Sequence, residues 1–375
     1  MRAIGLMSGT SLDGVDGVLT ELDAQTDGRI RAHLLRTVHL PYPPELTSAL
    51  LTLQARFTVR LDAIAEIEVA LAGVYADAVA ELRRADPAAD IRFVACHGQT
   101  VWHRPPRGDL PGRSLQWGNA AELAERSGLA VVSDFRAADL AAGGHGAPLV
   151  PLADHHLFGH AKENRCVQNI GGIANVTFLP AAGTPQGIQA FDTGPGTMLI
   201  DAAARRTGPP GTSYDRDGRG ARQGHVDHAL LDTLLRHPFL QQAPPRSTGR
   251  DAFGDALLDQ VLADWRGTAR DLLATLTEFT AASIADAYRR FLPAPDRVLV
   301  GGGGARNPTL LAALARRMHP IPVVPTDACG VPAESREALA FAILGLCSLL
   351  RRPGNVPQAT GARRAVVLGR WTPPA

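Results

Sequence analysis

The chain opens with the segment AIGLMSGTSLDGVDGVL (residues 3–19), in which two apolar runs flank a polar tip rich in glycine. This pattern is typical of a β-hairpin. The glycines of the tip, residues 9–16, are spaced as in a phosphate-binding loop, but Val15 occupies the place of the required lysine. Backbone N–H groups of a tight turn can still bind phosphate, and the hydroxyls of Thr10 and Ser11 can donate to its oxygens. A plain hairpin turn without a ligand is the alternative.

A second hairpin pattern turns at Gly171 and Gly172. Two-residue glycine turns are common, so this one is informative mainly as a second copy of the first. Strands and helices follow each hairpin, which indicates two related halves rather than one continuous sheet. We therefore predict an α/β chain with one lobe over residues 1–137, another over residues 138–350, and residues 351–375 packed back on the first.

Two long amphipathic helices are predicted over residues 61–84 and 269–291, because apolar residues recur there at helical spacing. A predicted strand over residues 91–96 leads into a cluster of polar side chains, as expected of a pocket that must satisfy sugar hydroxyls. The cluster consists of His97, Gln99, Thr100 and His103. Neither these histidines nor His155 and His156 have the spacing of a zinc site, so a transition-metal centre is disfavoured.

Asp192 stands at the carboxyl end of a predicted strand, residues 188–191, where a sheet presents side chains to a crevice. Gly194 and Gly196 leave room beside it. Its carboxylate can take a proton from water or a hydroxyl during phosphoryl or glycosyl transfer. An Asx-turn, or a cap for the helix that begins near Met198, is the structural alternative.

Gly301, Gly302 and Gly303 follow a predicted strand and precede a helix that Asn307 is expected to cap. Arg306 takes the place of the third glycine of the dinucleotide-binding fingerprint, which disfavours a dinucleotide fold. We expect a purine to lie against this bare glycine backbone, and close strand-to-helix packing is the alternative.

The charged residues exclude several classes of protein. One of the 38 basic residues, Lys162, is lysine, and its surroundings fit neither a Walker-A loop nor a protein kinase. A net charge of +1 offers no basic field for nucleic acid. The 4 cysteines form no Cys-x-x-Cys pair, and no apolar stretch approaches the length of a membrane span. We expect a cytoplasmic protein with no nucleic-acid and no membrane partner.

Eight short motifs follow one another along the chain. They are MSGTSLDG (residues 7–14), HGQT (97–100), DFR (134–136), GG with GAP (143–144 and 146–148), NIGG (169–172), FDTGPG (191–196), STGR (247–250) and GGGGA (301–305). Together and in this order they closely resemble the anhydro-N-acetylmuramic acid kinase family, over nearly the whole chain. The succession is far more specific than any single motif.

The resemblance implies the actin, sugar-kinase and Hsp70 fold, in which two ribonuclease-H-like lobes close on MgATP in a central nucleotide cleft. It implies that the first hairpin binds the ATP phosphates and that Asp192 of the FDTGPG motif is the catalytic base. Thr100, Arg136 and Glu337 are expected near the sugar. The expected nucleotide-binding residues are Gly9, Thr10, Ser11, Leu12, Asp13, Gly14, Val15, Asp16, Gly171, Gly172, Gly301, Gly302 and Gly303.

The expected cofactors are ATP and Mg²⁺. Asp13 and Asp16 would repel a triphosphate unless a divalent cation lay between them. Asp13 is the candidate ligand of an ATP-bound magnesium ion. Ligation by Asp16, or contacts through bridging waters, are the open alternatives.

The resemblance further implies a reaction with two bond changes. Water adds to the anomeric carbon of 1,6-anhydro-N-acetylmuramic acid, and the freed oxygen at carbon 6 takes the γ-phosphoryl group of ATP. The product, N-acetylmuramic acid 6-phosphate, belongs to peptidoglycan recycling. A simple amino-sugar kinase of the same fold and a non-enzymatic, ATP-gated binding module are the alternatives.

Two positions depart from the family pattern. Thr197 follows Gly-Pro-Gly where asparagine is frequent, and His145 stands where glutamine is frequent. Both leave fine substrate preference open, whereas neither removes the expected base. The sequence does not determine the oligomeric state. A homodimer is compatible with it.

Overall fold

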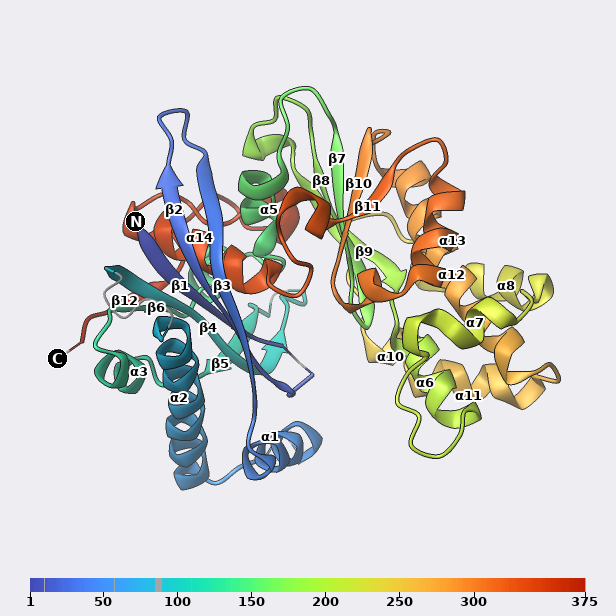
Figure 1. Cartoon of the computed structure of the whole chain (residues 1–375), viewed down its shortest axis with the longest axis horizontal. Helices are drawn as coiled ribbons and strands as arrows, with labels where there is room; N and C mark the ends of the chain where they lie inside the picture. Colours follow the sequence, from blue (N-terminus) through green and yellow to red (C-terminus); the bar gives the residue numbers. More distant parts are fainter. Residues whose placement is uncertain (10, 57, 85–89, 109, 375) are drawn as a thin grey trace. The chain divides into compact units, whose positions relative to one another are not determined.

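A computed structural model of the chain describes residues 1–9, 11–56, 58–84, 90–108 and 110–374 (Figure 1). The chain folds into two compact units. Met1–Leu157 and Ser335–Ala375 form the first unit, and Phe158–Glu334 forms the second.

The first unit is built on a mixed sheet with the strand order β12-β6-β4-β1-β2-β3, and β5 pairs with β4. Its strands are β1 (Arg2–Ser8), β2 (Gly14–Ala24), β3 (Ile30–Pro41), β4 (Ile91–Arg104), β5 (Arg113–Trp117), β6 (Val131–Ser133) and β12 (Arg370–Thr372). The first three strands are antiparallel neighbours, whereas β4 runs parallel to β1 and β6 runs parallel to β4. The hairpin predicted from residues 3–19 is confirmed as the β1–β2 pair.

Helices cover both faces of this sheet. They are α1 (Pro44–Arg56), α2 (Leu61–Arg83), α3 (Ala120–Ser127), α4 (Ala137–Ala141), α5 (Val150–Phe158), α14 (Arg336–Leu349) and α15 (Pro357–Thr360). Ile4 and Leu6 of β1 share a hydrophobic core with Leu71 of α2, whereas Gly5 between them lies against Ala338 of α14. Because successive strand residues point to opposite faces, α2 and α14 cover opposite faces of the sheet.

The second unit is built on a mixed sheet with the strand order β11-β10-β7-β8-β9. Its strands are β7 (Arg165–Ile170), β8 (Ile173–Leu179), β9 (Gln189–Pro195), β10 (Arg297–Gly301) and β11 (Val323–Pro325). The strands β7, β8 and β9 are antiparallel neighbours, and β10 runs parallel to both β7 and β11. The hairpin predicted around Gly171 and Gly172 is confirmed as the β7–β8 pair.

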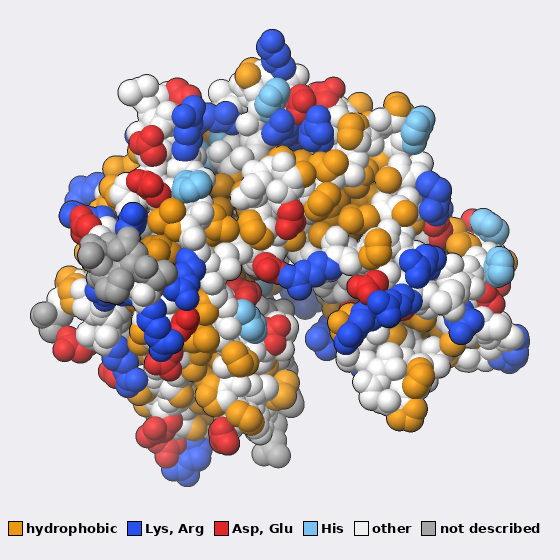
Figure 2. Space-filling model, viewed as in Figure 1, with side chains coloured by type: hydrophobic (Ala, Val, Ile, Leu, Met, Phe, Trp, Pro, Cys, Tyr) orange, Lys and Arg blue, Asp and Glu red, His pale blue; other side chains and the backbone are white. Residues whose placement is uncertain are grey.

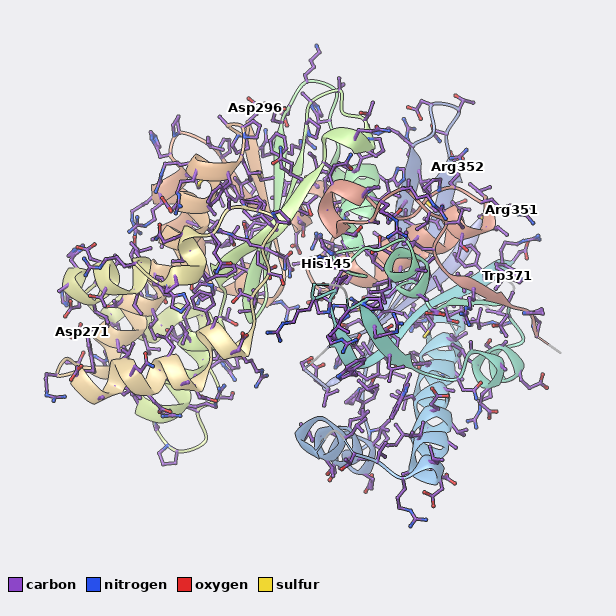
Figure 3. The ribbon with its side chains drawn as sticks, turned by 180° about the vertical axis from the view of Figure 1, so that it is seen from behind. His145, Asp271, Asp296, Arg351, Arg352 and Trp371 are labelled. Carbon is purple, nitrogen blue, oxygen red and sulfur yellow. The ribbon has the colours of Figure 1, made fainter. Side chains whose placement is uncertain are left out.

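Helices of the second unit pack on this sheet and around the long helix α12. The α-helices are α6 (Met198–Thr207), α7 (Arg219–Gln223), α8 (His228–Leu235), α9 (Pro238–Gln241), α10 (Arg250–Phe253), α11 (Asp255–Asp264), α12 (Ala269–Phe291) and α13 (Pro308–Met318). The short 3₁₀ helices are η1 (Pro185–Gly187), η2 (Arg216–Gly218), η3 (Gly303–Arg306) and η4 (Thr326–Cys329). Thr268 and Asp271, the latter labelled in Figure 3, form a capping box that fixes the start of α12.

The two sheets repeat one topology. The order β3-β2-β1-β4-β6 in the first unit corresponds strand for strand to β9-β8-β7-β10-β11 in the second, with the same parallel and antiparallel pairs. This repeat confirms the α/β class and the two ribonuclease-H-like halves that the paired hairpins indicated. The central nucleotide cleft stays a prediction.

Several local predictions can be compared with the structure. The helix predicted over residues 269–291 is confirmed with the same bounds, and that over residues 61–84 ends one residue earlier, at Arg83. The strand predicted over residues 91–96 continues to Arg104, because β5 pairs with its second half. The polar cluster from His97 to His103 therefore lies within β4 rather than after it.

The two units divide the chain at other positions than the expected lobes, residues 1–137 and 138–350. Helices α4, α5 and α14 belong to the first unit apart from the last residue of α5, because α14 packs on β1 and β4. Residues 351–375 also belong to the first unit, where Asn355 and Thr360 donate hydrogen bonds of 2.6 and 2.7 Å to the buried carboxylate of Asp139.

Acidic and basic side chains are interspersed over the visible faces of the units (Figure 2). This distribution accords with the net charge of +1. Of the helices that the structure describes, none combines the length and the apolar character needed to cross a membrane.

The close approach of β1 and α14 leads to a prediction about stability. A Cβ atom added at Gly5 would lie 2.0 Å from the carbonyl oxygen of Ala338, so Gly5→Ala must push α14 off the sheet. We expect a loss of about 1–3 kcal/mol in the free energy of unfolding, measured by chemical denaturation. Gly73→Ala in α2 is the control, because its Cβ would meet only the end of the Arg126 side chain and alanine favours a helix. Equal stability of the two variants would contradict this account.

Candidate functional site

The tip of the β1–β2 hairpin is shaped by the strands beside it. The side-chain amide of Gln99 on β4 donates to the carbonyl oxygen of Gly9 at 3.0 Å. Gly14 has a φ of +154°, and an added Cβ would lie 2.2 Å from the carbonyl oxygen of Leu40 on β3. Only glycine fits there, and the buried Leu12 also has a left-handed φ of 58°. The turn is thus set by its own backbone and by close neighbours.

The polar side chains of this tip have different surroundings. Ser11 donates a 2.6 Å hydrogen bond to the exposed carboxylate of Asp13. The carboxylate of Asp16 lies 2.8 Å from Nδ1 of His39, and burial raises the pKa of Asp16 while His39 acts to lower it. Val15 is fully buried in β2, between β1 and β3, so neither its side chain nor its backbone is exposed to a phosphate. Thr10, the other expected hydroxyl donor, lies outside the described residues.

Magnesium was expected at this tip. Among the residues that the structure describes, no three or more histidine, cysteine, aspartate or glutamate side chains gather as a metal site. A nucleotide-bound magnesium ion requires less, because one or two carboxylates and the phosphates complete its shell with water. The exposed carboxylate of Asp13 is a hard oxygen donor and fits that role, which stays a prediction.

Thr100, the first of the expected sugar-site residues, lies on β4 beside two polar residues of β5. The side-chain amide of Gln116 donates to the hydroxyls of Thr100 at 3.3 Å and Ser114 at 2.7 Å, and Ser114 also lies 3.0 Å from Nδ1 of His103. Burial, together with the charge of Arg136, lowers the pKa of His103 to about 4. His103 is therefore neutral near pH 7 and serves as a hydrogen-bonding group rather than a cation.

Arg136 and Glu337, the other two expected sugar-site residues, lie within electrostatic reach of each other in the first unit. The guanidinium of Arg136 donates to Nε2 of His97 at 3.0 and 3.2 Å and to the carbonyl oxygen of Gly146 at 3.0 Å. Burial lowers the pKa of Arg136 to about 10, so the group stays charged near pH 7. Burial and Arg136 lower the pKa of His97 well below its usual value, which leaves Nε2 free to accept.

Glu337 occupies the first turn of α14, where the helix dipole favours a carboxylate. Burial nevertheless raises the pKa of Glu337, and the charges of Arg336 and Arg136 act to lower it. The structure thus gathers a neutral imidazole, a guanidinium and a carboxylate of raised pKa. No described hydrogen bond links Thr100 to this group.

A buried ion pair missed by the sequence reasoning anchors the start of α14. Arg336 donates to both carboxylate oxygens of Asp154 on α5, at 2.8 Å from Nε and by a second contact from Nη2. Both side chains are almost fully buried. No motif or spacing connects the two residues, so only the tertiary structure could reveal the pair.

Three glycine-containing segments, residues 171–172, 196–197 and 301–303, meet at one end of the second sheet. The N–H of Gly196 donates to the carbonyl oxygen of Gly172 at 2.9 Å, and that of Thr197 donates to Gly171 at 2.8 Å. Gly302, with a φ of +78°, leaves no room for a Cβ beside Asn169 and Ile170. The predicted nucleotide-binding glycines at 171–172 and 301–303 are therefore brought together, with backbone groups at their surface.

Helix α13, which follows the glycines at 301–303, begins as predicted. Asn307 caps α13 by accepting from the N–H groups of Thr309 and Leu310, and Pro308 is its first residue. A pocket of about 340 Å³ lies beside α13. It is lined by Ala221, Arg222, Gly224 and Val226, by Ala274, Thr277 and Glu278 of α12, and by Pro308, Thr309, Ala312, Ala313 and Arg316 of α13.

The two positions that depart from the family pattern have ordinary structural surroundings. His145, labelled in Figure 3, lies in the loop between α4 and α5, and its N–H donates to the carbonyl oxygen of Thr360 at 2.7 Å. Thr197 precedes α6, where its hydroxyl stabilises the carboxylate of Asp201.

Asp192, the expected base, lies within β9 and is partly buried. Its Oδ2 accepts a 2.8 Å hydrogen bond from the N–H of Thr248, and no described residue donates to Oδ1. Burial raises its pKa to about 6, against the lowering effects of the Thr248 N–H and the charge of Arg246. The carboxylate is thus mostly ionised at pH 7 and still basic enough to accept a proton.

The chain is similar to known proteins along nearly its whole length. The profile of the family described as anhydro-N-acetylmuramic acid kinase matches residues 1–374. The anhydro-N-acetylmuramic acid kinase of a Cyanothece strain is 45% identical over 377 residues, covering 98% of each chain. That of Acaryochloris marina is 42% identical over 377 residues, covering 98% of this chain and 99% of its own.

Solved structures resemble the chain more distantly. The activator of the 2-hydroxyisocaproyl-CoA dehydratase from Clostridium difficile, with bound ADPNP, has a TM-score of 0.46 and 13% identity, over 92% of this chain and 93% of its own. A ROK family glucokinase from Streptomyces griseus, in complex with glucose and AMPPNP, has a TM-score of 0.41 and 13% identity, over 92% and 99%.

The duplicated α/β topology and the glycine-lined strand ends define an α/β protein with two repeated sheets. The match to the family profile over residues 1–374 is more specific than the fold, because it identifies a family. The chain belongs to the anhydro-N-acetylmuramic acid kinase family.

The buried pair of Arg336 and Asp154 gives the second prediction. Asp154→Ala leaves a buried guanidinium without its partner, so we expect a loss of about 3–5 kcal/mol in the free energy of unfolding. Replacing both residues by apolar ones, Asp154→Leu with Arg336→Met, removes both buried charges and should restore most of that loss. Chemical denaturation of the single and double variants measures both effects.

Asp62→Ala is a matched control, because it removes one partner of an exposed ion pair with Arg60 and should leave stability unchanged. A double variant no more stable than Asp154→Ala would contradict the explanation by charge burial.

Proposed function

We propose that the chain is an ATP-dependent kinase that opens 1,6-anhydro-N-acetylmuramic acid by adding water and phosphorylates the sugar at O6. The products are N-acetylmuramic acid 6-phosphate and ADP, and we assign the reaction to cytoplasmic recycling of peptidoglycan. Family membership supports the substrate. The surroundings of the Asp192 carboxylate support its role as the base. One of its oxygens accepts a hydrogen bond from Thr248, and the other is free to accept a proton.

Asp192 begins the reaction by accepting a proton from water as the water oxygen bonds to the anomeric carbon. The bond from that carbon to the internal ether oxygen breaks, and the freed O6 attacks the γ-phosphorus of ATP as the bond from that phosphorus to the β–γ bridging oxygen breaks. ADP leaves with that oxygen, and Asp192 releases its proton to solvent. Asp192 must be ionised for the first step, and its pKa of about 6 allows this near pH 7.

Arg136, Glu337 and Thr100 bind the sugar in this proposal. Arg136 is a charged, half-buried guanidinium oriented by His97, and it suits the lactyl carboxylate of the substrate. Glu337 and the hydroxyl of Thr100 suit sugar hydroxyls.

The triphosphate is bound without a lysine in this proposal. Exposed backbone around Ser11 and Asp13, with the hydroxyl of Ser11, would bind phosphate. The turn at Gly171 and Gly172 offers backbone of the same kind. Asp13 would hold a magnesium ion, which neutralises phosphate charge when bound. The purine lies against Gly301–Gly303 in this proposal.

Removal of the base is the main test of the Asp192 assignment. Asp192→Asn should lower turnover by about 10²- to 10⁴-fold with the KM for ATP largely kept, because the amide cannot take the proton. In the unmodified protein, turnover should rise with pH through about 6, as Asp192 ionises. Steady-state kinetics across pH measure both effects.

Thermal unfolding provides the control for this variant. A pKa raised from 3.8 to about 6 means that ionisation of Asp192 destabilises the folded state, a cost that grows from pH 3.8 and is complete above about pH 6. Asp192→Asn should therefore unfold at or above the usual temperature at pH 7. A folded variant with near-normal turnover would show that Asp192 is not the base.

The reaction itself is tested with the anhydro sugar, ATP and ¹⁸O-labelled water. The proposal expects the label at carbon 1 of the 6-phosphate product, because water supplies the oxygen that the ether loses. N-acetylmuramic acid is assayed in parallel. Phosphate transfer only to the open sugar would indicate a simple amino-sugar kinase, and ATP turnover unaffected by either sugar would indicate an ATP-gated binding module.

A further inference from the structure

Arg246 makes an unusually complete set of contacts beside Asp192. Its guanidinium donates to four backbone carbonyl oxygens: Asp192 at 2.8 Å, Thr193 at 3.3 Å, Leu240 at 3.2 Å and Gln242 at 2.9 Å. The carbonyl oxygen of Arg246 in turn accepts from the N–H of Asp192 at 3.2 Å. The side chain of Arg246 is therefore linked twice to the strand that carries the base.

Aromatic rings enclose this guanidinium. The Cζ atom of Arg246 lies 5.4 Å from the ring centroid of Phe191, 5.0 Å from that of Phe239 and 4.9 Å from that of Phe291. The residue is only 7% exposed. Cation–π attraction offsets part of the cost of burying the charge, and the four carbonyl groups satisfy its N–H donors.

The position of β9 in its sheet explains why such a residue is needed. β9 is an edge strand, paired on one side with β8, where Asn175 lies opposite Asp192. On the other side, no strand in the described part of the chain pairs with the N–H and C=O groups of Asp192. Arg246 meets both groups, and two residues later the N–H of Thr248 meets the Asp192 carboxylate.

We propose that Arg246 is the positioning residue for the base of this kinase: it closes the open edge of β9 at Asp192 and thereby fixes the direction of the carboxylate. This inference rests on the proposed function. Lysine could not replace arginine fully, because a single ammonium group cannot reach carbonyl oxygens on β9 and on the α9 segment in the same fixed geometry.

The charge of Arg246 adds a second, separable effect. It lowers the pKa of Asp192, against the raising effect of burial. The other charged groups that face Arg246 are Arg290 and Asp286 on α12, and they form an ion pair of 3.2 Å with each other. Removing the Arg246 charge should therefore raise the pKa of Asp192 and move the acid limb of turnover to higher pH.

Two variants separate the effect of Arg246 on the position of the Asp192 carboxylate from the effect of its charge. Arg246→Met removes both, so turnover should fall by about 10- to 100-fold with the KM for ATP within about threefold, and the acid limb should move to higher pH. Arg246→Lys keeps the charge but loses most of the hydrogen bonds. It should lower turnover while its acid limb stays at the wild-type pH, and it serves if the methionine variant fails to fold.

Arg290→Met is the matched control. Arg290 also lies over Phe291, at 4.8 Å, and also donates to the carbonyl oxygen of Leu240, at 2.9 Å, but it makes no described hydrogen bond to Asp192 or Thr193. We expect its turnover and its acid limb to remain unchanged, even if its unfolding temperature falls. If the variants at 246 and 290 behave alike in kcat and in pH profile, Arg246 is merely structural and the proposal is overturned.

A direct titration keeps this inference distinct from the proposed function. In protein with ¹³C-labelled aspartate carboxyls, the Asp192 signal is assigned by its loss in Asp192→Asn, and its pKa is read from the shift with pH. We expect a higher pKa in Arg246→Met than in Arg290→Met, whether or not the anhydro sugar is a substrate. An unchanged Asp192 pKa would refute the electrostatic link, whereas absence of turnover in the unmodified protein would refute the proposed function alone.

Discussion

Close contact between backbones, possible only at glycine, is the constraint on which both units depend. In the first unit Gly5 lets α14 lie directly on β1, and Gly14 lets the first hairpin meet β3. In the second unit a Cβ at Gly196 would lie 2.0 Å from the carbonyl oxygen of Gly171. This packing fixes the course of both glycine turns, the segments for which phosphate binding is proposed.

The charged side chains near these strand ends are oriented by partners that satisfy them. Arg136 is oriented by His97, Arg336 by Asp154, and Arg246 by backbone carbonyl groups and aromatic rings. A planar guanidinium with five donors suits such sites better than an ammonium group. The scarcity of lysine agrees with this use of arginine, because an ammonium group lacks the planar set of donors that these sites require.

Local patterns predicted much of the fold. Helical spacing of apolar residues gave the bounds of α12, and the glycine turns gave both hairpins, because each signal lies within one short stretch of chain. The predicted end of β4 was wrong because pairing with β5 extends the strand. The division into units could not be read from the order of the elements, because α14 returns to the first sheet after the whole second unit.

The sequence by itself determined the family, the duplicated halves and the identity of the candidate base, Asp192, since each is carried by contiguous motifs. Only the tertiary structure decided what surrounds that base and the sugar-site candidates. Arg246 lies 54 residues from Asp192, and Arg336 lies 182 residues from Asp154. Partners so far apart leave no periodicity or spacing to detect, because their meeting depends on how the sheets and helices pack.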